Sequence, residues 1–552
     1  MESESARRCN QLRRAYGDPF LQYIFALDGQ SVTPELFARQ PAELVEELFQ
    51  VAVEPSFDDL IEADVSYNAL AHYLPRYDRN VARATELRLK AGGVLPRSPI
   101  TDDEFLGEMF TYASIHWPAV TLLCGWHDSI RRMGISTGFR NQSSNHQEEV
   151  AAAFLKDEAL SRLFPSPNRE QAVRSPSFVS SDWQLSFDPP GMVSTTVGLV
   201  IEQMLLVSAV RLAARQLPWD FWSFWEKVVE TVQRYRSLAR GEEVSFPVLI
   251  GLGGLPMDGF DGVVFHGGHS LRKTTALDSH FLGNVGSGTH TVTLEIPTKL
   301  LSCSWDPQTA INSRVTELVE EKLNLIRLAI YLGTGPQRGI ATTRYFTRFF
   351  SPRSPASTEI WGATVLETNH PQPDVEVGKD DVARVVGEHE VLFPLLSKAH
   401  HIILPVRRLL QAAGNRMHPT DKLVDAFIAI ESLLSPGSGT EKLTQNLATV
   451  ISYLLEGNAD AQRVQLEQHV KDLYDARSDI VHGNRNTRDL AFDEAQQAVW
   501  LAARVLHALC LPENRHLLPM KASTRNKHLL RTALSTKSTN PDSDSSDPKC
   551  AR

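Results

Sequence analysis

The sequence has 552 residues, of which 42% are hydrophobic and 22% charged, and its net charge at pH 7 is −10. This length predicts two to four domains, and the apolar content excludes a chain that is disordered throughout. The acidic net charge excludes a protein that covers nucleic acids non-specifically. Any contact with RNA is therefore expected from a local basic patch.

The cysteines and the most apolar stretch bear on metals and membranes. The five cysteines are far apart and form no Cys-x-x-Cys pair, which argues against a disulfide framework and a structural zinc site. The first five residues lack the pattern of a signal peptide. Residues 193–213 are interrupted by Glu202 and Arg211, which favours a buried amphipathic helix over a membrane span. We expect a cytoplasmic protein without a cofactor, a metal or a membrane contact.

Residues 1–240 predict a helical N-terminal region of unknown role. Thr33 followed by Pro34 is typical of the start of a helix. Residues 166–190 are rich in Ser and Pro and predict a linker or surface loop. A crowded aromatic segment is interpreted as core or inter-domain packing, in preference to a base-stacking or partner surface. Its members are Trp219, Phe221, Trp222, Phe224 and Trp225.

Residues 245–375 predict a mixed, β-containing region. Val292, Leu294 and Ile296 alternate with polar residues, which is typical of a half-buried strand. Residues 251–254 (Gly-Leu-Gly-Gly) follow an apolar run, but no Gly-Lys-Ser/Thr is present, so a strand turn is favoured over a nucleotide loop. His266 and His269 could approach a metal, but a polar loop is favoured because no third ligand is near in sequence.

Residues 312–332 predict a helix with one apolar face, and residues 359–366 predict a strand. Residues 371–381 are polar, contain two prolines and are interpreted as the last domain boundary. From there, residues 380–515 predict a compact helical bundle. The tail, residues 516–552, is rich in Ser and Thr and locally basic, and we expect it to be disordered and solvated rather than bound to RNA. Its cations include Lys521, Arg525, Lys527 and Arg531.

An arginine lies on the apolar face of one bundle helix. If residues 466–482 are helical, Arg477 continues the stripe formed by Leu466, Val470 and Leu473. A guanidinium stays charged and is costly to bury unpaired, so an anionic partner is expected. The preceding helix offers Glu431 at the margin of its own apolar stripe.

A histidine follows on the same helix. Gly483 after His482 is typical of a helix end, so His482 is expected in the last turn or at the cap. Five residues of separation turn about 140° on an ideal helix, so Arg477 and His482 do not stack directly. They converge only if the helix end unwinds or if a second copy of the chain completes the site.

The two helices together resemble a known superfamily. Residues 425–434 (DAFIAIESLL) and 474–483 (YDARSDIVHG) are similar to the HEPN superfamily, and most closely to its ApeA-like branch. In that branch a Glu-x-Leu-Leu type pattern precedes a Tyr-x-x-Arg-Ser-x-x-Val-His-Gly type signature. The resemblance covers about the last quarter of the chain before the tail, and residues 1–380 resemble no family.

The resemblance implies a helical bundle that pairs with a second copy, and a metal-independent endoribonuclease with an Arg-x4–6-His motif. Many members act as toxins or in anti-phage defence. The motif carries over to Arg477 and His482 as catalytic residues. Ser478 follows the arginine where many members have Asn, Asp or His, so either Ser478 or Asp479 takes the accessory polar role, with Glu431 in support.

The chemistry agrees with these residue types, because RNA carries its own nucleophile in the 2′-hydroxyl. A neutral imidazole can take that proton, and a guanidinium can hold two phosphate oxygens. The alternative is a non-catalytic module for dimerisation and for binding a nucleotide or RNA, in which Arg477 is structural and His482 caps a helix. His400 and His401, beside Lys398, are weaker candidates for an RNA groove than for a solvated or interfacial face. The sequence therefore predicts a mainly α, multidomain protein with RNA as substrate, a homodimeric state and an unknown trigger.

Overall fold

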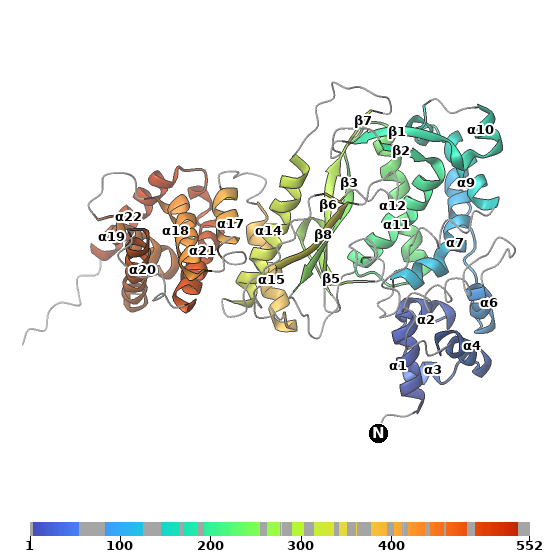
Figure 1. The fold of residues 1–552 in the computed structure, drawn as a ribbon, viewed down its shortest axis with the longest axis horizontal. Helices are drawn as coiled ribbons and strands as arrows, with labels where there is room; N and C mark the ends of the chain where they lie inside the picture. Colours follow the sequence, from blue (N-terminus) through green and yellow to red (C-terminus); the bar gives the residue numbers. More distant parts are fainter. Residues whose placement is uncertain are drawn as a thin grey trace, which may run out of the picture. The chain divides into compact units, whose positions relative to one another are not determined.

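The computed structural model divides the chain into two compact units, which are described separately (Figure 1). Unit 1 comprises residues 1–253, 261–319 and 343–365, and unit 2 comprises 254–260, 320–342 and 366–552. The structure describes residues 4–53, 83–124, 145–165, 169–185, 193–253, 262–275, 278, 290–302, 314–335, 342–349, 360–361, 377–394, 402–410, 412, 418–435, 442–457, 460–482 and 492–538.

Unit 1 contains helices that share one hydrophobic core. Thr33 caps α3 by accepting a bond from the Leu36 N–H at 3.4 Å, as its position before Pro34 predicted. The helices are α1 (Glu4–Tyr16), α2 (Asp18–Ile24), α3 (Pro34–Phe37), α4 (Ala42–Val53), α6 (Arg83–Lys90), α7 (Glu104–Cys124), α9 (Asn145–Lys156), α10 (Arg169–Arg174), α11 (Val197–Ala214) and α12 (Phe221–Ala239).

Helix α11 is the most apolar helix of the described chain. By length and composition it could cross a membrane, but 94% of it is buried within the structure. The predicted burial is confirmed, whereas the predicted amphipathic character is wrong, because Glu202 and Arg211 are buried as well. Arg211 is neutralised by two bonds to Glu295, of 2.9 and 3.1 Å, which makes its burial tolerable.

Two antiparallel sheets complete unit 1. The first has the strand order β2-β1-β7, and the second β4-β5-β6-β3-β8-β9. In the second sheet, Phe246 of β3 lies opposite Ile296 of β6, and Leu252 opposite His290. The strands are β1 (Ser180–Leu185), β2 (Val193–Thr196), β3 (Val244–Gly253), β4 (Gly262–Val264), β5 (Ser270–Lys273), β6 (His290–Thr298), β7 (Leu300–Ser302), β8 (Thr342–Phe349) and β9 (Ile360–Trp361).

Three local expectations in unit 1 need correction. Residues 180–185 form β1 inside the segment expected to be a linker, so the N-terminal region is not helical throughout. Strand β6 forms as predicted, but it is buried on both faces, because the polar alternates Thr291 and Thr293 are also covered. Residues 251–253 continue strand β3 and do not form a turn there.

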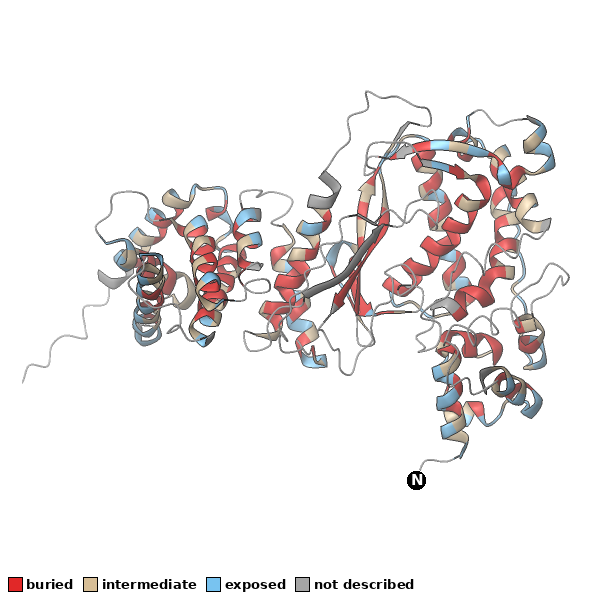
Figure 2. Cartoon of the chain, in the orientation of Figure 1, coloured by how far each residue is buried: buried red, intermediate tan, exposed pale blue. Residues whose placement is uncertain are grey.

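Unit 2 is a helical bundle with its own core (Figure 2). Helices α14 and α15 approach so closely that a Cβ at Gly333 would lie 2.6 Å from Val385 Cγ2. The helices are α14 (Arg314–Thr334), of which unit 2 includes residues 320–334, then α15 (Lys379–Leu392), α17 (Ile403–Leu410), α18 (Pro419–Leu434), α19 (Leu443–Glu456), α20 (Asp460–Val481), α21 (Phe492–Cys510) and α22 (Ala522–Ser538).

The structure divides the chain differently from the sequence patterns. The expected middle region, 245–375, is not a separate unit, because its strands belong with the N-terminal helices and most of α14 belongs with the bundle. The expected disordered tail is wrong for residues 522–538, which form α22. Arg525 on this helix is buried and donates to the carbonyls of Leu433, Leu517, Leu518 and Met520, so it is not available to RNA.

Candidate RNA-cleavage site on helices α18 and α20

Helix α18 supplies the carboxylate of the candidate site. Pro419 occupies its first turn, where a missing N–H costs nothing. Leu423, Phe427 and Ile430 are buried along one face, as their spacing predicted. Glu431 lies at the edge of this face with 30% of its side chain exposed. It is therefore close enough to the core to need a partner, and open enough to reach solvent.

Helix α20 supplies the arginine. Val470 and Leu473 are buried against the bundle core, and Arg477 follows them on the same stripe. Only 19% of the Arg477 side chain is exposed. Its Nη2 lies 3.5 Å from Glu431 Oε2, so the predicted ion pair across α18 and α20 forms.

Tyr474 joins this pair as a third member. Its hydroxyl donates to Glu431 Oε1 at 3.2 Å. The Arg477 guanidinium carbon lies 5.7 Å from the centre of the tyrosine ring, within the range of a cation–π contact. The ring also packs edge-on against Phe427 at 5.5 Å. Burial raises the pKa of Tyr474, and the nearby charge of Glu431 adds to this, so the hydroxyl remains protonated and a donor at neutral pH.

Arg477 is held more loosely than a structural arginine such as Arg211, which makes two bonds to Glu295 of 2.9 and 3.1 Å. Arg477 has one contact of 3.5 Å to Glu431, and its buried Nε has no hydrogen-bond partner among the described residues. Among the described residues, Arg463 also has a buried Nε without a hydrogen-bond partner. However, Arg463 Nη2 donates to the Ala533 carbonyl at 3.1 Å. The guanidinium of Arg477 thus retains donors that an anion could occupy.

His482 lies immediately beyond α20, as predicted. The helix is intact through Val481, and the His482 backbone N–H donates to the Ser478 carbonyl at 3.0 Å. The His482 side chain is exposed. Because the helix does not unwind, Arg477 and His482 point in directions about 140° apart on an ideal helix. A single copy of the described chain therefore does not bring the two side chains together.

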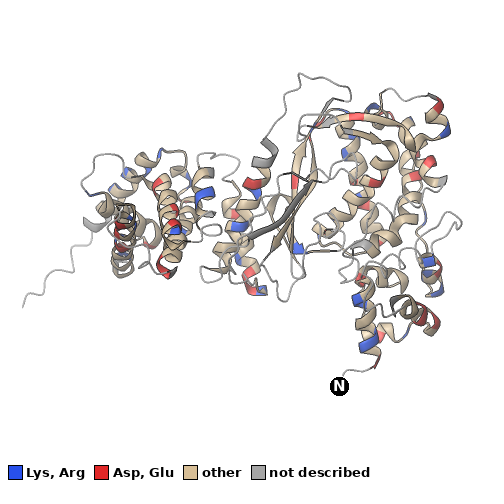
Figure 3. Cartoon of the chain, viewed as in Figure 1, with Lys and Arg blue, Asp and Glu red and all other residues tan. Residues whose placement is uncertain are grey.

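The two accessory candidates lie on different sides of α20. Ser478 is partly buried, whereas Asp479 is exposed. Asp479 continues an exposed stripe with Asp472 and Asp475 at steps of three and four residues. Elsewhere in the bundle, acidic and basic side chains are interspersed over the helices (Figure 3). The stripe places negative charge on the side of the helix that carries His482.

Of the other histidines considered in the sequence, His269 has a structural role in unit 1. His269 is buried, and its Nδ1 accepts a bond from the Glu295 backbone N–H at 3.3 Å. No group of three His, Cys, Asp or Glu residues within the described ranges could hold a metal ion. His400, His401 and Lys398 lie outside the described residues.

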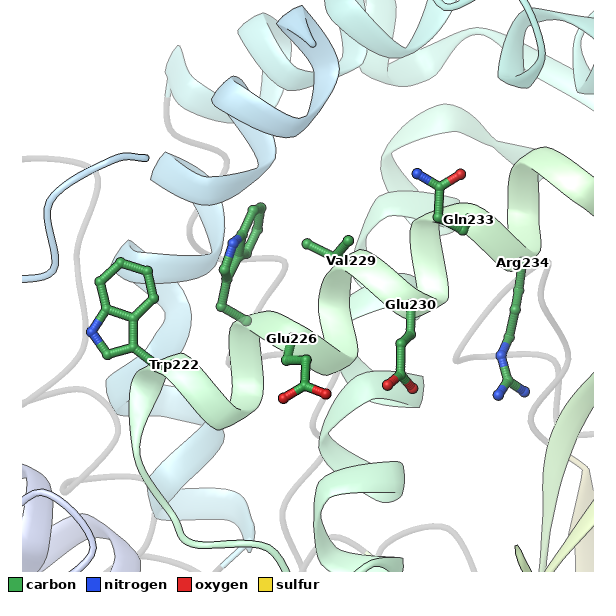
Figure 4. Close-up of a pocket in the computed structure, with 7 residues that line it drawn as sticks. Trp222, Glu226, Val229, Glu230, Gln233 and Arg234 are labelled. Atoms are coloured by element: carbon green, nitrogen blue, oxygen red, sulfur yellow. The ribbon is translucent and has the colours of Figure 1, made fainter. Parts of the chain in front are cut away.

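The aromatic segment is mostly core, as interpreted. Phe224 stacks on Trp117 at 4.8 Å, and Trp225 packs edge-on against Phe110 at 5.0 Å. Trp222 is the exception, with 52% of the residue exposed. It borders a cavity of about 630 Å³ along α12 (Figure 4). The remaining lining residues are Trp225, Glu226, Val229, Glu230, Gln233 and Arg234.

Tyr474 is the member of the site to which sequence reasoning gave no role. Its signal was present, because it precedes Arg477 by three residues and so shares its side of the helix. Spacing alone could not assign its hydroxyl to Glu431, which lies on another helix. Comparisons with family models, curated proteins and solved structures find no match to this chain.

Proposed function

We propose that the chain is a metal-independent endoribonuclease of the HEPN type that acts as a toxin or in anti-phage defence, with residues 1–380 regulating the bundle. The observation that carries the proposal is the loose hold on Arg477, whose buried Nε has no partner within the described residues. Because 19% of the Arg477 side chain remains exposed, a phosphate oxygen can approach the guanidinium and supply the acceptors that Glu431 does not.

In this mechanism Arg477 binds the scissile phosphate and stabilises the charge that develops in the transition state. His482 removes the proton from the 2′-hydroxyl, which attacks the adjacent phosphorus and expels the 5′-oxygen of the next nucleotide. The leaving 5′-oxygen takes a proton from solvent, so the products are a 2′,3′-cyclic phosphate and a 5′-hydroxyl. Because His482 points away from Arg477 within one chain, the His482 that acts with Arg477 comes from a second copy.

The test is incubation of the purified full-length protein with total RNA in EDTA. Wild type should cleave and leave a 2′,3′-cyclic phosphate with a 5′-hydroxyl, while His482→Ala and Arg477→Ala should not cleave. His469→Ala is the matched control, because His469 is a partly buried histidine earlier on α20. Inhibition by EDTA, 5′-phosphate ends, or full activity of His482→Ala would each contradict the proposal.

A second candidate is a non-catalytic module for dimerisation or for binding RNA or a nucleotide. The observation that favours it is the intact end of α20, which keeps His482 exposed and about 140° from Arg477. In that case Arg477 only stabilises the fold, and binding of RNA is unaffected by His482→Ala. Binding without cleavage by wild type would favour this candidate.

A further inference from the structure

The carboxylate that faces Arg477 is shared with a tyrosine. Glu431 receives the Tyr474 hydroxyl on Oε1 at 3.2 Å and the Arg477 guanidinium near Oε2 at 3.5 Å. Packing of the Tyr474 ring against Phe427 restricts where its hydroxyl can point. Each oxygen of the carboxylate is therefore directed to a different residue of α20.

Two guanidinium–carboxylate pairs of unit 1 are arranged differently. Arg88 Nη2 donates to both oxygens of Asp28, at 2.8 and 2.9 Å. Arg13 uses its Nε and Nη2 on the two oxygens of Asp18, at 2.5 and 2.7 Å. In both pairs one arginine engages both carboxylate oxygens. A two-point contact of the Arg13 type would occupy the same donors that a phosphate needs.

We propose that Tyr474 is a positioning residue that competes with Arg477 for Glu431 and so keeps the guanidinium available to a phosphate group. The bond from the hydroxyl turns Oε1 toward Tyr474, so only Oε2 lies within reach of Arg477, and Nε stays unpaired. When a phosphate binds, Glu431 retains the bond from Tyr474 and is not left without a donor. This inference rests on the proposed function, since it names the residue that prepares Arg477 for the anion.

Tyr474→Phe tests the competition, because it removes the hydroxyl and keeps the ring. The first measurement is the rate at which phenylglyoxal modifies Arg477 in the full-length protein, read by peptide mass spectrometry. The second is kcat/KM on a dye-labelled single-stranded oligoribonucleotide. In the variant Glu431 should turn both oxygens toward Arg477, so both values should fall about 5- to 10-fold, the range for the net contribution of a typical hydrogen bond.

Tyr453→Phe is the matched control. Tyr453 is a partly buried tyrosine of α19 whose ring lies 5.3 Å from the guanidinium carbon of Arg463. Among the described residues its hydroxyl has no carboxylate partner. Removing this hydroxyl should leave the Arg477 modification rate and kcat/KM unchanged.

Glu431→Gln makes the test independent of how Tyr474→Phe folds. A neutral amide cannot form a charged two-point contact with the guanidinium, so this variant should raise the rate of Arg477 modification. Adding Tyr474→Phe to Glu431→Gln should then have no further effect. The proposal is overturned if Tyr474→Phe leaves Arg477 modification unchanged, or if its effect persists beside Glu431→Gln. If wild type does not cleave RNA, the proposed function fails, while the modification rates still decide the role of Tyr474.

Discussion

Arg477 and Glu431 meet because each lies at the margin of an apolar stripe, where a long side chain reaches across two helices and keeps part of its surface in solvent. Arg477→Ala should lower the free energy of unfolding of the bundle by about 1 to 2 kcal/mol, because packing and one contact are lost while Tyr474 still donates to Glu431. His482→Ala should cost less than about 0.5 kcal/mol, because its side chain is exposed. Arg477→Met, which keeps the apolar stem, should fall between the two in urea unfolding followed by circular dichroism. Equal losses for Arg477→Ala and His482→Ala would contradict this order.

At the scale of elements, strand β6 buries a titratable histidine. Burial lowers the pKa of His290 to about 4, and the charge of Lys273 adds to this. The unfolded chain takes up a proton near pH 6.5 and the folded chain does not, so stability falls as the pH drops below 6.5 and levels off near pH 4. The loss should be about 2 kcal/mol at pH 5. His290→Gln should reduce the fall in unfolding midpoint between pH 7.5 and 5, whereas His266→Gln, at an exposed position of the same unit, should not. A wild-type midpoint that does not change over this interval would rule out the assigned burial effect.

Helix α22 is held to the bundle by a buried arginine. Arg525 donates to the Leu433 carbonyl at 2.6 Å, and Asn526 donates to the Leu434 carbonyl at 2.8 Å, so α22 caps the end of the helix that carries Glu431. Arg525→Met should lower the free energy of unfolding of the bundle by about 3 kcal/mol, because several buried carbonyls lose their donor. Lys527→Met, at an exposed position of the same helix, should change it by less than about 0.5 kcal/mol. Similar stability of the two variants in urea unfolding would show that α22 is not needed to cap α18.

At the scale of the whole molecule, the proposed cleavage site requires two copies of the chain, because one copy does not bring Arg477 and His482 together. Sizing with light scattering at micromolar concentration should show a dimer or larger. A mixture of His482→Ala and Arg477→Ala chains should regain about a quarter of wild-type cleavage, because half of the dimers are mixed and each mixed dimer has one complete site. Each variant alone should remain inactive. No recovery in the mixture, or full activity of a monomer, would mean that the site does not form between copies.

The sequence by itself determined the helical bundle and the pairing of Arg477 with Glu431. Helical periodicity is a local property, and it correctly assigned the stripes of α18 and α20, the helix at α14 and the position of His482 at the end of α20. A charged residue on an apolar stripe needs a partner wherever the stripe is buried, so Glu431 could be named in advance.

The tertiary structure decided what depended on distant segments. Strand β1 pairs with β7, and β3 with β6, each far along the chain, so the sequence did not reveal that these strands belong with the N-terminal helices or that both faces of β6 are covered. Helix α22 has a polar composition typical of a tail, but Arg525 finds four carbonyl partners only after the bundle has formed. Tyr474 likewise acquires its place in the site from a hydroxyl that reaches another helix. Local patterns fix which face of an element is buried, whereas the partners of its polar groups are fixed only when the elements pack together.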